Sequence, residues 1–448
     1  MIKQITLEHI KGRLTKGLIG FLALWCFFHF DTFKQENVIR HDMSSYYGYL
    51  PATFIYRDLS LQSIPETEKQ HYEWVIPAEN GPVFRMTMGV ALMNTPAFLA
   101  GHAFSLMSGK ESNGFNSTYY FFLLLSALFF FYQGLLISFK LANRYTSFYP
   151  AVLSTVLIGF ATNLFYYTFD EGLMSHVYSF YLYALLLEST LSWHEEPKRK
   201  DALAIGFALG MLTLIRPIHA LAVLIPMLYS PDKAKWLKLK QHSSHVLWIA
   251  LVGLLCVSPQ LLYWKYMSGS WIFYSYGDEG FFFSEPMLWK GLFGFRKGWL
   301  LYTPVMLVAL LGIIRLWRVA PAFRLSLLFL PIYIWVVYSW WCWWYGGSFG
   351  SRPMIDIYAL LAIPLALSLT WLRKFTRSQL VFPMAFSLLF ISLNLFQTKQ
   401  YRSTLLHWDG MNKELYERIW LDPYFPKNYQ ELVQSPDYEA AKKGNRNQ

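Results

Sequence analysis

The stretch HDMSSYYGYLP, residues 41–51, places an acid, two serines and three tyrosines shortly after the first apolar segment of the chain. A carboxylate held near apolar surface can take a proton from a hydroxyl or an amine as that group attacks, so Asp42 is a candidate general base. The alternative is that Asp42 caps the N-terminus of a helix, and the sequence alone favours neither role. Tyr46 and Tyr49 of the same stretch are candidate contacts to the substrate.

Two arginines are candidates for holding an anion. Arg216 precedes Pro217 at the tip of an expected helical hairpin, and Arg352 follows the glycine-rich run YGGSFGS. A guanidinium binds phosphate through two parallel hydrogen bonds, and glycines let backbone amides approach an anion closely. The plain alternatives are that Arg216 snorkels to the membrane interface, the commoner role of an isolated arginine, and that the glycine-rich run is a flexible turn.

Two histidines lie within or at the edges of apolar helices, where ionisable side chains are costly and usually functional. His176 and His219 are therefore candidate substrate contacts, and hydrogen-bonded interfacial histidines are the simpler alternative. The acidic pairs in FDEG, residues 169–172, and GDEG, residues 277–280, offer oxygen ligands for a divalent cation. Neither pair has a specific metal-ligand spacing, so we predict no metal site. The sequence indicates no cofactor with certainty and leaves open whether the protein uses a divalent cation.

The elements that position these residues are expected to be membrane-spanning helices. Of the 448 residues, 54% are hydrophobic and only 15% are charged, a balance unlike that of a soluble globular protein. Apolar runs long enough to cross about 30 Å of hydrocarbon recur, for example FFLLLSALFFFYQGLLISF at residues 121–139. The net charge of +11 comes mainly from short Lys/Arg clusters between such runs, a pattern of cytoplasmic turns and not of nucleic-acid binding.

These clusters predict an all-α polytopic membrane protein with its N-terminus inside and eleven spans. The expected spans are residues 17–32, 118–139, 148–169, 174–192, 201–215, 217–230, 245–264, 299–317, 324–341, 354–372 and 378–396. Residues 86–107 would then stay on the outer interface, within a long outward loop at 33–117. The chain would divide into a transmembrane domain, 1–396, and an outward tail, 397–448, whose polar end is typical of disorder. All the candidate residues above would face outward.

The residue types and the order of six segments resemble those of a known family. The segments are HDMSSYYGYLPATFIYRD, GVALMNTPAFLAGH, MSHVYSFYLYALLL, GFALGMLTLIRPIHALAVLIP, SPQLLYWKYMSGS and WWYGGSFGSR. Together they resemble bacterial members of the GT-C superfamily, integral-membrane glycosyltransferases that include protein O-mannosyltransferases and the aminoarabinose transferase of lipid A. The similarity runs from about residue 17 to 396. It implies a GT-C-like fold in the bacterial inner membrane, with the active site on the extracytoplasmic face.

The same resemblance implies an inverting transfer of a sugar from a polyprenyl-phosphate carrier to an extracytoplasmic protein, lipid or glycan. The Asp of the first outward loop acts as base in the family, and by position it matches Asp42. Basic residues near the carrier phosphate would correspond to Arg216 and Arg352. The chain departs from the protein O-mannosyltransferase pattern, because Asp42-Met43 stands where that pattern has an adjacent Asp-Glu pair.

Two other classes of protein compete with this interpretation. A lipid-carrier flippase or transporter would line a cavity at the middle of the bilayer with charged residues, whereas the charged residues here are expected at one face. A membrane acyltransferase or ligase with a histidine base would need His176 or His219 and would work without Asp42.

Overall fold

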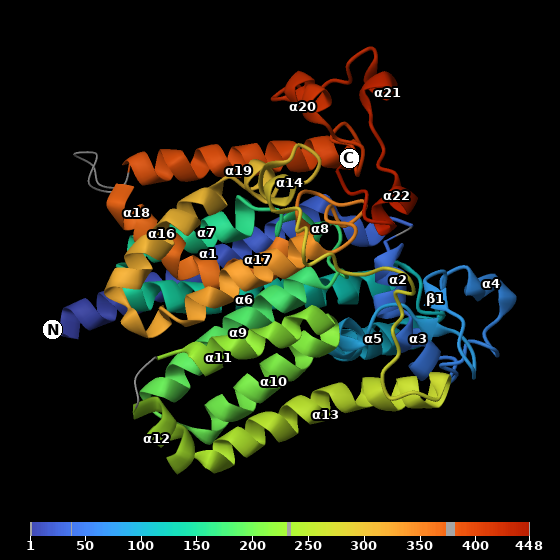
Figure 1. Ribbon diagram of the computed structural model, residues 1–448, viewed down its shortest axis with the longest axis horizontal. Helices are drawn as coiled ribbons and strands as arrows, with labels where there is room; N and C mark the ends of the chain where they lie inside the picture. Colours follow the sequence, from blue (N-terminus) through green and yellow to red (C-terminus); the bar gives the residue numbers. More distant parts are fainter. Residues whose placement is uncertain (1, 37, 231–233, 373–380, 448) are drawn as a thin grey trace. The chain divides into compact units, whose positions relative to one another are not determined.

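The computed structural model describes residues 2–36, 38–230, 234–372 and 381–447 (Figure 1). About 67% of the chain is helical. The strands within the described residues are β1 (Val75–Ile76) and β2 (Val83–Phe84), which form one antiparallel pair. The all-α class expected from composition is thereby confirmed. The chain divides into two compact units: unit 1 is Met1–Ile137, Tyr167–Ala220 and Leu239–Ser275, and unit 2 is Ser138–Tyr166, Leu221–Lys238 and Tyr276–Gln448.

Unit 1 contains several long helices and a group of short ones. Its helices are α1 (Ile2–Phe30), η1 (Thr32–Lys34), α2 (Asp42–Tyr47), α3 (Tyr49–Phe54), α4 (Glu66–Lys69), α5 (Gly89–Met107), most of α6 (Ser117–Tyr145) and of α8 (Tyr166–Phe169), α9 (His176–Glu195), α10 (Arg199–Ile215) and α13 (Ser243–Ser268). Helices α10 and α13 approach closely because α10 has glycines four residues apart. A Cβ at Gly206 would lie 2.6 Å from the carbonyl oxygen of Ile249, and one at Gly210 would lie 2.8 Å from that of Gly253.

Unit 2 combines shorter helices around α18. Its helices are α7 (Phe148–Phe160), α11 (Leu224–Leu228), α14 (Leu288–Phe293), α15 (Trp299–Tyr302), α16 (Val305–Val319), η3 (Pro321–Phe323), η4 (Ser326–Leu328), α17 (Phe329–Ser339), η5 (Arg352–Leu361), α18 (Ala362–Leu372), α19 (Val381–Arg402), α20 (Lys413–Ile419), α21 (Tyr429–Leu432) and α22 (Tyr438–Lys442). Helix η2 (Pro217–Val223) and α12 (Ala234–Gln241) lie where the units join along the chain. Hydroxyl groups hold α18 on its neighbours: Ser154 donates to the carbonyl of Ala362 and Ser368 to that of Val308.

The expected eleven spans are not supported. Among the described residues, six helices are long and apolar enough to cross a membrane: Gly12–Lys34, Gly89–Met107, Ser117–Tyr145, Ser243–Ser268, Arg352–Trp371 and Val381–Arg402. Several apolar runs that were expected to span are broken into shorter helices. In the run 148–169, α7 ends at Phe160, and the Thr162 hydroxyl accepts the N–H of Leu164 at 3.2 Å and so competes with helical bonding.

Two further expected spans are short or divided. The run 217–230 begins at Pro217 and forms η2 followed by the five-residue helix α11. The run 299–317 is divided between α15 and α16 at Pro304, which has no backbone N–H for a continuous helix. The first residues of the expected span 378–396 lie outside the described residues, and the rest belong to α19.

Residues 86–107, expected to lie on the outer interface, contain α5, one of the six helices of spanning length. Two of its polar side chains are hydrogen-bonded inside unit 1. Asn94 Nδ2 donates to the carbonyl of Val90 at 3.0 Å and to the Tyr178 hydroxyl at 2.7 Å. His102 Nδ1 lies 2.6 Å from the Tyr119 hydroxyl. Because these groups are paired within the protein, they do not prevent the helix from crossing a membrane.

The end of the chain, expected to be disordered, is an ordered part of unit 2. Helix α20 is capped by Asn412, whose side chain accepts the N–H of Leu415, and α22 is capped in the same way by Asp437. Arg446, two residues from the C-terminus, is buried, and its guanidinium donates to the carbonyls of Ser339 and Trp340 at 3.4 Å. Specific caps and long-range hydrogen bonds therefore order a segment whose polar composition suggested disorder.

Candidate functional site

The candidate base lies at the start of a short helix whose other residues are buried. Helix α2 begins at Asp42, and His41 occupies the N-cap position with φ 52 and ψ −133. Asp42 is therefore the first helical residue and not the N-cap. A positive φ is strained for any residue but glycine, and such strain collects at functional sites. Asp42, the acidic residue of α2, is half-exposed, whereas the following five residues of the helix are buried.

Residues 86–88, which directly precede α5, connect α2 to the end of α10 through hydrogen bonds. The N–H of Met86 donates to Ser45 Oγ of α2 at 2.9 Å, and the Thr87 hydroxyl donates to the carbonyl of Ile215, the last residue of α10, at 3.1 Å. The N–H of Met88 donates to Gln260 Oε1 of α13 at 2.8 Å. Figure 1 shows α3 close to the end of α13 within this unit. One three-residue segment thus joins the helix of Asp42 and the turn that follows α10.

Arg216 stands in that turn. It is the C-cap residue of α10, with an extended backbone at φ −150 and ψ 120 and an N–H that donates to the carbonyl of Leu212. The residue is half-exposed. Unit 1 therefore carries a half-exposed carboxylate and a half-exposed guanidinium on elements that share one hydrogen-bonded segment.

The two candidate histidines are buried inside unit 1. The ring of His219 is fully buried, with Nδ1 3.1 Å from the Tyr183 hydroxyl and Nε2 3.5 Å from Ser179 Oγ. His176 begins α9, is also buried, and meets the Tyr167 ring edge-on at 5.1 Å. The sequence interpretation of an outward interfacial site required exposed histidine rings, and neither ring is exposed.

Tyr46 and Tyr49 are buried as well. The Tyr49 hydroxyl donates to the carbonyl of Met86 at 2.8 Å, and its ring lies 4.3 Å from that of Phe84 and 5.3 Å from that of Tyr263. Burial raises the pKa of Tyr49 well above its ordinary value, so the hydroxyl stays protonated. Its hydrogen bond to Met86 gives Tyr49 a structural role next to the segment that joins α2 to α10.

Arg352 belongs to unit 2, where it begins η5 and is half-exposed. The glycines of the preceding turn adopt positive φ, 64 at Gly346 and 60 at Gly350, as expected for a tight turn. The backbone N–H groups, however, already donate within the protein: that of Gly346 to Cys342 Sγ, that of Ser348 to the carbonyl of Trp408 and that of Arg352 to the carbonyl of Gly350. These three amides are used in the fold, so the anion-binding nest is not supported, and the guanidinium stays a candidate.

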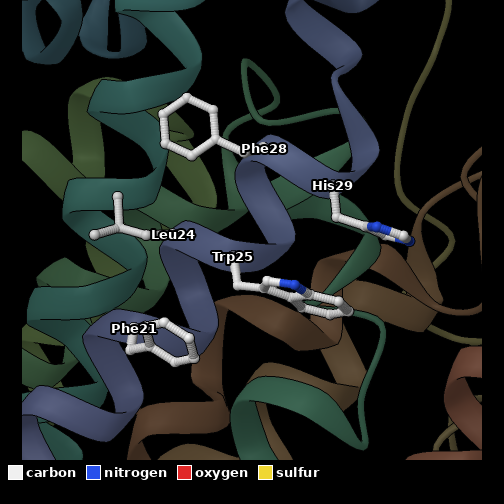
Figure 2. A pocket seen from close by; sticks show the side chains of 5 residues that line it. All are labelled: Phe21, Leu24, Trp25, Phe28 and His29. Carbon is white, nitrogen blue, oxygen red and sulfur yellow. The ribbon is translucent and has the colours of Figure 1, made fainter.

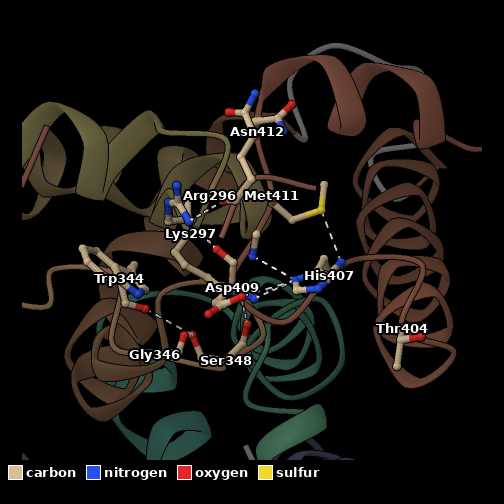
Figure 3. A network of polar contacts seen from close by, with 12 residues as sticks. Arg296, Lys297, Trp344, Gly346, Ser348, Thr404, His407, Asp409, Met411 and Asn412 are labelled. Atoms are coloured by element: carbon tan, nitrogen blue, oxygen red, sulfur yellow. Dashed lines mark hydrogen bonds and ion pairs between the residues drawn. The ribbon is translucent and has the colours of Figure 1, made fainter. Parts of the chain in front are cut away.

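Unit 2 also contains a buried polar network that no local sequence pattern indicated (Figure 3). Arg296 is buried, and its Nη1 donates to the carbonyls of Asp409 at 2.6 Å and Gln434 at 3.1 Å. The Lys297 ammonium is buried too and donates to the carbonyl of Ser348. Burial lowers the pKa of Arg296, and the nearby Asp409 carboxylate opposes this shift.

The acidic member of the network is equally enclosed. Asp409 Oδ2 accepts from the Tyr438 hydroxyl at 3.1 Å, and Oδ1 lies 3.4 Å from Nδ1 of His407. His407 Nδ1 in turn accepts the N–H of Gly410 at 2.9 Å. Arg296 and Lys297 donate to backbone carbonyls. The Asp409 carboxylate contacts the side chains of His407 and Tyr438. This network therefore holds residues 407–438 on unit 2 and does not present its charge to a ligand.

A hollow of about 390 Å³ lies on the surface of α1, lined by Phe21, Leu24, Trp25, Phe28 and His29 (Figure 2). All five residues come from this one helix, and the rings of Trp25 and His29 stack at 4.8 Å. The apolar members are exposed on a helix of spanning length. Because a ligand site needs several converging polar groups, this hollow is better explained as a lipid-facing surface.

Within the part of the chain that the structure describes, no group of three or more His, Cys, Asp or Glu residues is placed to hold a metal ion. Comparisons of the chain with protein-family models, with curated proteins and with solved structures find no match. The glycosyltransferase interpretation therefore depends on the six sequence segments and on the geometry around Asp42.

Proposed function

We propose that the protein is a membrane glycosyltransferase that moves a sugar from a polyprenyl-phosphate carrier to an extracytoplasmic acceptor with inversion. Asp42 is the general base. The observation that carries this proposal is the half-exposed carboxylate at the start of the otherwise buried helix α2, next to the strained residue His41. The hydrogen bonds of residues 86–88 to α2 and to the end of α10 give further support, because they tie Asp42 to the element that carries Arg216.

The chemistry follows from these two groups. The acceptor oxygen attacks the anomeric carbon of the sugar, Asp42 takes the proton of that oxygen, and the bond between the sugar and the carrier phosphate breaks. A single displacement of this kind inverts the anomeric configuration. Arg216 stabilises the negative charge that develops on the leaving phosphate.

The geometry favours this reaction over an acyl transfer with a histidine base. A general base must come within hydrogen-bonding reach of the proton that it removes. His219 is fully buried and hydrogen-bonded to Tyr183, and His176 is buried, whereas Asp42 is half-exposed. For a flippase, the ionisable residues would line a cavity at the middle of the bilayer, whereas Asp42 and Arg216 both lie at ends of helices.

The test uses the purified full chain in lipid vesicles with a panel of undecaprenyl-phosphate sugars, covering hexoses, pentoses and amino sugars. A heat-treated bacterial envelope extract supplies candidate protein, lipid and glycan acceptors. Release of free undecaprenyl phosphate from each lipid donor is measured over time, and release of free nucleotide from a water-soluble nucleotide sugar is measured in parallel as the control. We expect release from at least one lipid donor and none from the control. Absence of release across the whole panel, or efficient use of the nucleotide sugar, would contradict the proposal.

A further inference from the structure

Residues 420–425, WLDPYF, form a loop between α20 and α21 that is exposed along its whole length; we call it the aromatic loop. Its apolar and aromatic side chains keep much of their surface open: Trp420 48%, Leu421 60%, Tyr424 77% and Phe425 50%. Four neighbouring exposed side chains of this kind are costly in water, and such a patch marks an interaction surface.

The exposure belongs to a folded loop and not to a frayed one. Asp422 Oδ1 accepts the N–H of Tyr424 at 3.0 Å, and the N–H of Asp422 donates to the carbonyl of Ile419 at 3.1 Å. The ring of Phe425 meets that of Tyr429 at 4.8 Å, and the Tyr429 hydroxyl donates to the carbonyl of Thr404. These contacts hold the four side chains outward in a fixed turn.

Hydrogen bonds fix the position of the loop along the axis of α19, a helix of spanning length, near the end of that helix. Gln400 Nε2 donates to the carbonyls of Ile419 at 2.7 Å and Asp422 at 2.8 Å, which flank Trp420 and Leu421. Gln400 is buried in the last turn of α19, which ends at Arg402. Figure 1 shows α20 and the chain after it beside this end of α19. With a rise of about 1.5 Å per residue, Gln400 lies only about 3 Å along the helix from its last residue.

The surroundings of the loop have the composition of a membrane interface. Exposed cations lie at the end of α19, Lys399 and Arg402, and on either side of the loop, Arg418 and Lys427, together with the exposed acids Glu414, Glu417 and Asp422. Trp and Tyr together with long cationic side chains concentrate where a bilayer meets water. A hollow of about 270 Å³ lined by Phe295, Leu301, Tyr416, Glu417 and Trp420 extends the apolar surface beside Trp420.

We propose that the aromatic loop docks on the membrane, with the side chains of Trp420, Leu421, Tyr424 and Phe425 in the headgroup region of the leaflet in which α19 ends. The occupant of this surface is the lipid itself. The C-terminal residues after α19 are then held against the bilayer and do not project into the aqueous phase. This inference is independent of the sugar-transfer chemistry, because it uses no residue around Asp42.

The test places an environment-sensitive fluorophore on the loop of the full-length protein. Cys256, the native cysteine that is not buried, is first replaced by Ser, and Tyr424→Cys is then introduced and labelled. The matched control is Ser435→Cys, an exposed residue of the same C-terminal segment outside the loop. Both proteins are checked for folding by size-exclusion chromatography and reconstituted into phosphatidylcholine/phosphatidylglycerol vesicles. Quenching is measured with headgroup nitroxide lipids, with acyl-chain nitroxide lipids and with aqueous iodide.

We expect the label at position 424 to be quenched several-fold more strongly by headgroup nitroxide lipids than the label at 435, and less by iodide. Equal iodide quenching at the two positions would overturn the proposal, because the loop would then lie in water. Protection of position 424 from both iodide and nitroxide lipids would also overturn it, because another protein surface would then cover the loop. Strongest quenching by acyl-chain nitroxides would contradict the headgroup depth.

Discussion

Unit 1 and unit 2 each bring ionisable side chains together, but they use them differently. In unit 2, Arg296 and Lys297 are buried and donate to backbone carbonyls of segments far along the chain. In unit 1, Asp42 and Arg216 are half-exposed at the ends of α2 and α10. Charge alone therefore does not mark a site. What separates the two regions is the burial of the charged residues: Arg296 and Lys297 are buried, whereas Asp42 and Arg216 are half-exposed.

The difference has an energetic basis. A buried cation that donates to carbonyls stabilises the fold, because its removal leaves those carbonyls without a donor in a place that water does not reach. A half-exposed ion keeps contact with water, so its interactions contribute less to stability than those of a buried ion. Substitutions in unit 2 should therefore lower stability, and those at the ends of α2 and α10 should lower activity with the fold intact.

The largest expected effect on stability is that of Arg296→Ala. It removes the hydrogen bonds to the carbonyls of Asp409 and Gln434 and should cost about 3 kcal/mol. We expect a lower thermal unfolding temperature and faster proteolysis of the residues after α19. Arg418→Ala is the control, because this arginine is exposed and pairs with Glu414 on the surface. Equal unfolding temperatures for the two variants would show that the network does not hold the C-terminal segment.

Arg216 should show the opposite behaviour. If its guanidinium holds the carrier phosphate through two hydrogen bonds, Arg216→Ala should reduce transfer by about 100-fold and Arg216→Lys by about tenfold, with little change in unfolding temperature. The measurement is transfer rate against lipid-donor concentration at equal amounts of folded protein. Identical curves for wild type and Arg216→Lys would favour simple snorkelling, and an unchanged Arg216→Ala would leave Arg352 as the candidate.

A smaller effect is expected at Tyr49, which was predicted as a substrate contact. Tyr49→Phe removes the hydrogen bond to the carbonyl of Met86 and should cost about 1 kcal/mol of stability. Because the hydroxyl is buried and engaged, we expect the donor concentration at half-maximal rate to stay unchanged. A large rise in that concentration without loss of stability would instead assign Tyr49 to the substrate.

Cys342 should show almost no reactivity. Burial raises the pKa of its thiol to about 12, and the nearby Arg352 only partly opposes this shift. The thiol therefore stays protonated at pH 8 to 9, and the thiolate needed for alkylation forms only near and above about pH 12. Peptide mapping after treatment of the folded protein with N-ethylmaleimide should find Cys342 unmodified. Rapid modification at pH 8 would mean that the turn around it is open.

The sequence predicted the long helices best. The expected spans 118–139 and 245–264 lie inside α6 and α13, because continuous apolar runs of this length favour one uninterrupted helix, and α13 accommodates Pro259 without a break. The failures came where local chemistry overrides hydropathy. Thr162 and Pro304 divide apolar runs, while Asn94 and His102 are paired inside the protein and leave α5 long enough to span.

The candidate site was less predictable. The structure places Asp42 and Arg216 at helix ends, but burial could not be read from the motifs, and His219 and Tyr49 are enclosed. The network of unit 2 was missed because its partners are distant in the chain: Arg296 bonds to Asp409, 113 residues away. No local spacing encodes such a pair, and it becomes visible only when the chain is folded.

The role of Asp42 is tested most directly by the rate of carrier-phosphate release from the active lipid donor for two matched variants, Asp42→Asn and Asp31→Asn. Asp31 is the preceding aspartate in the chain, and it forms an exposed ion pair with Lys34 at 2.6 Å, so its amide variant controls for the loss of one carboxylate charge near this part of the chain. We predict a fall of at least about 100-fold for Asp42→Asn, with the protein folded, and a rate near that of wild type for Asp31→Asn. Similar rates for the two variants would contradict the assignment of Asp42 as the general base.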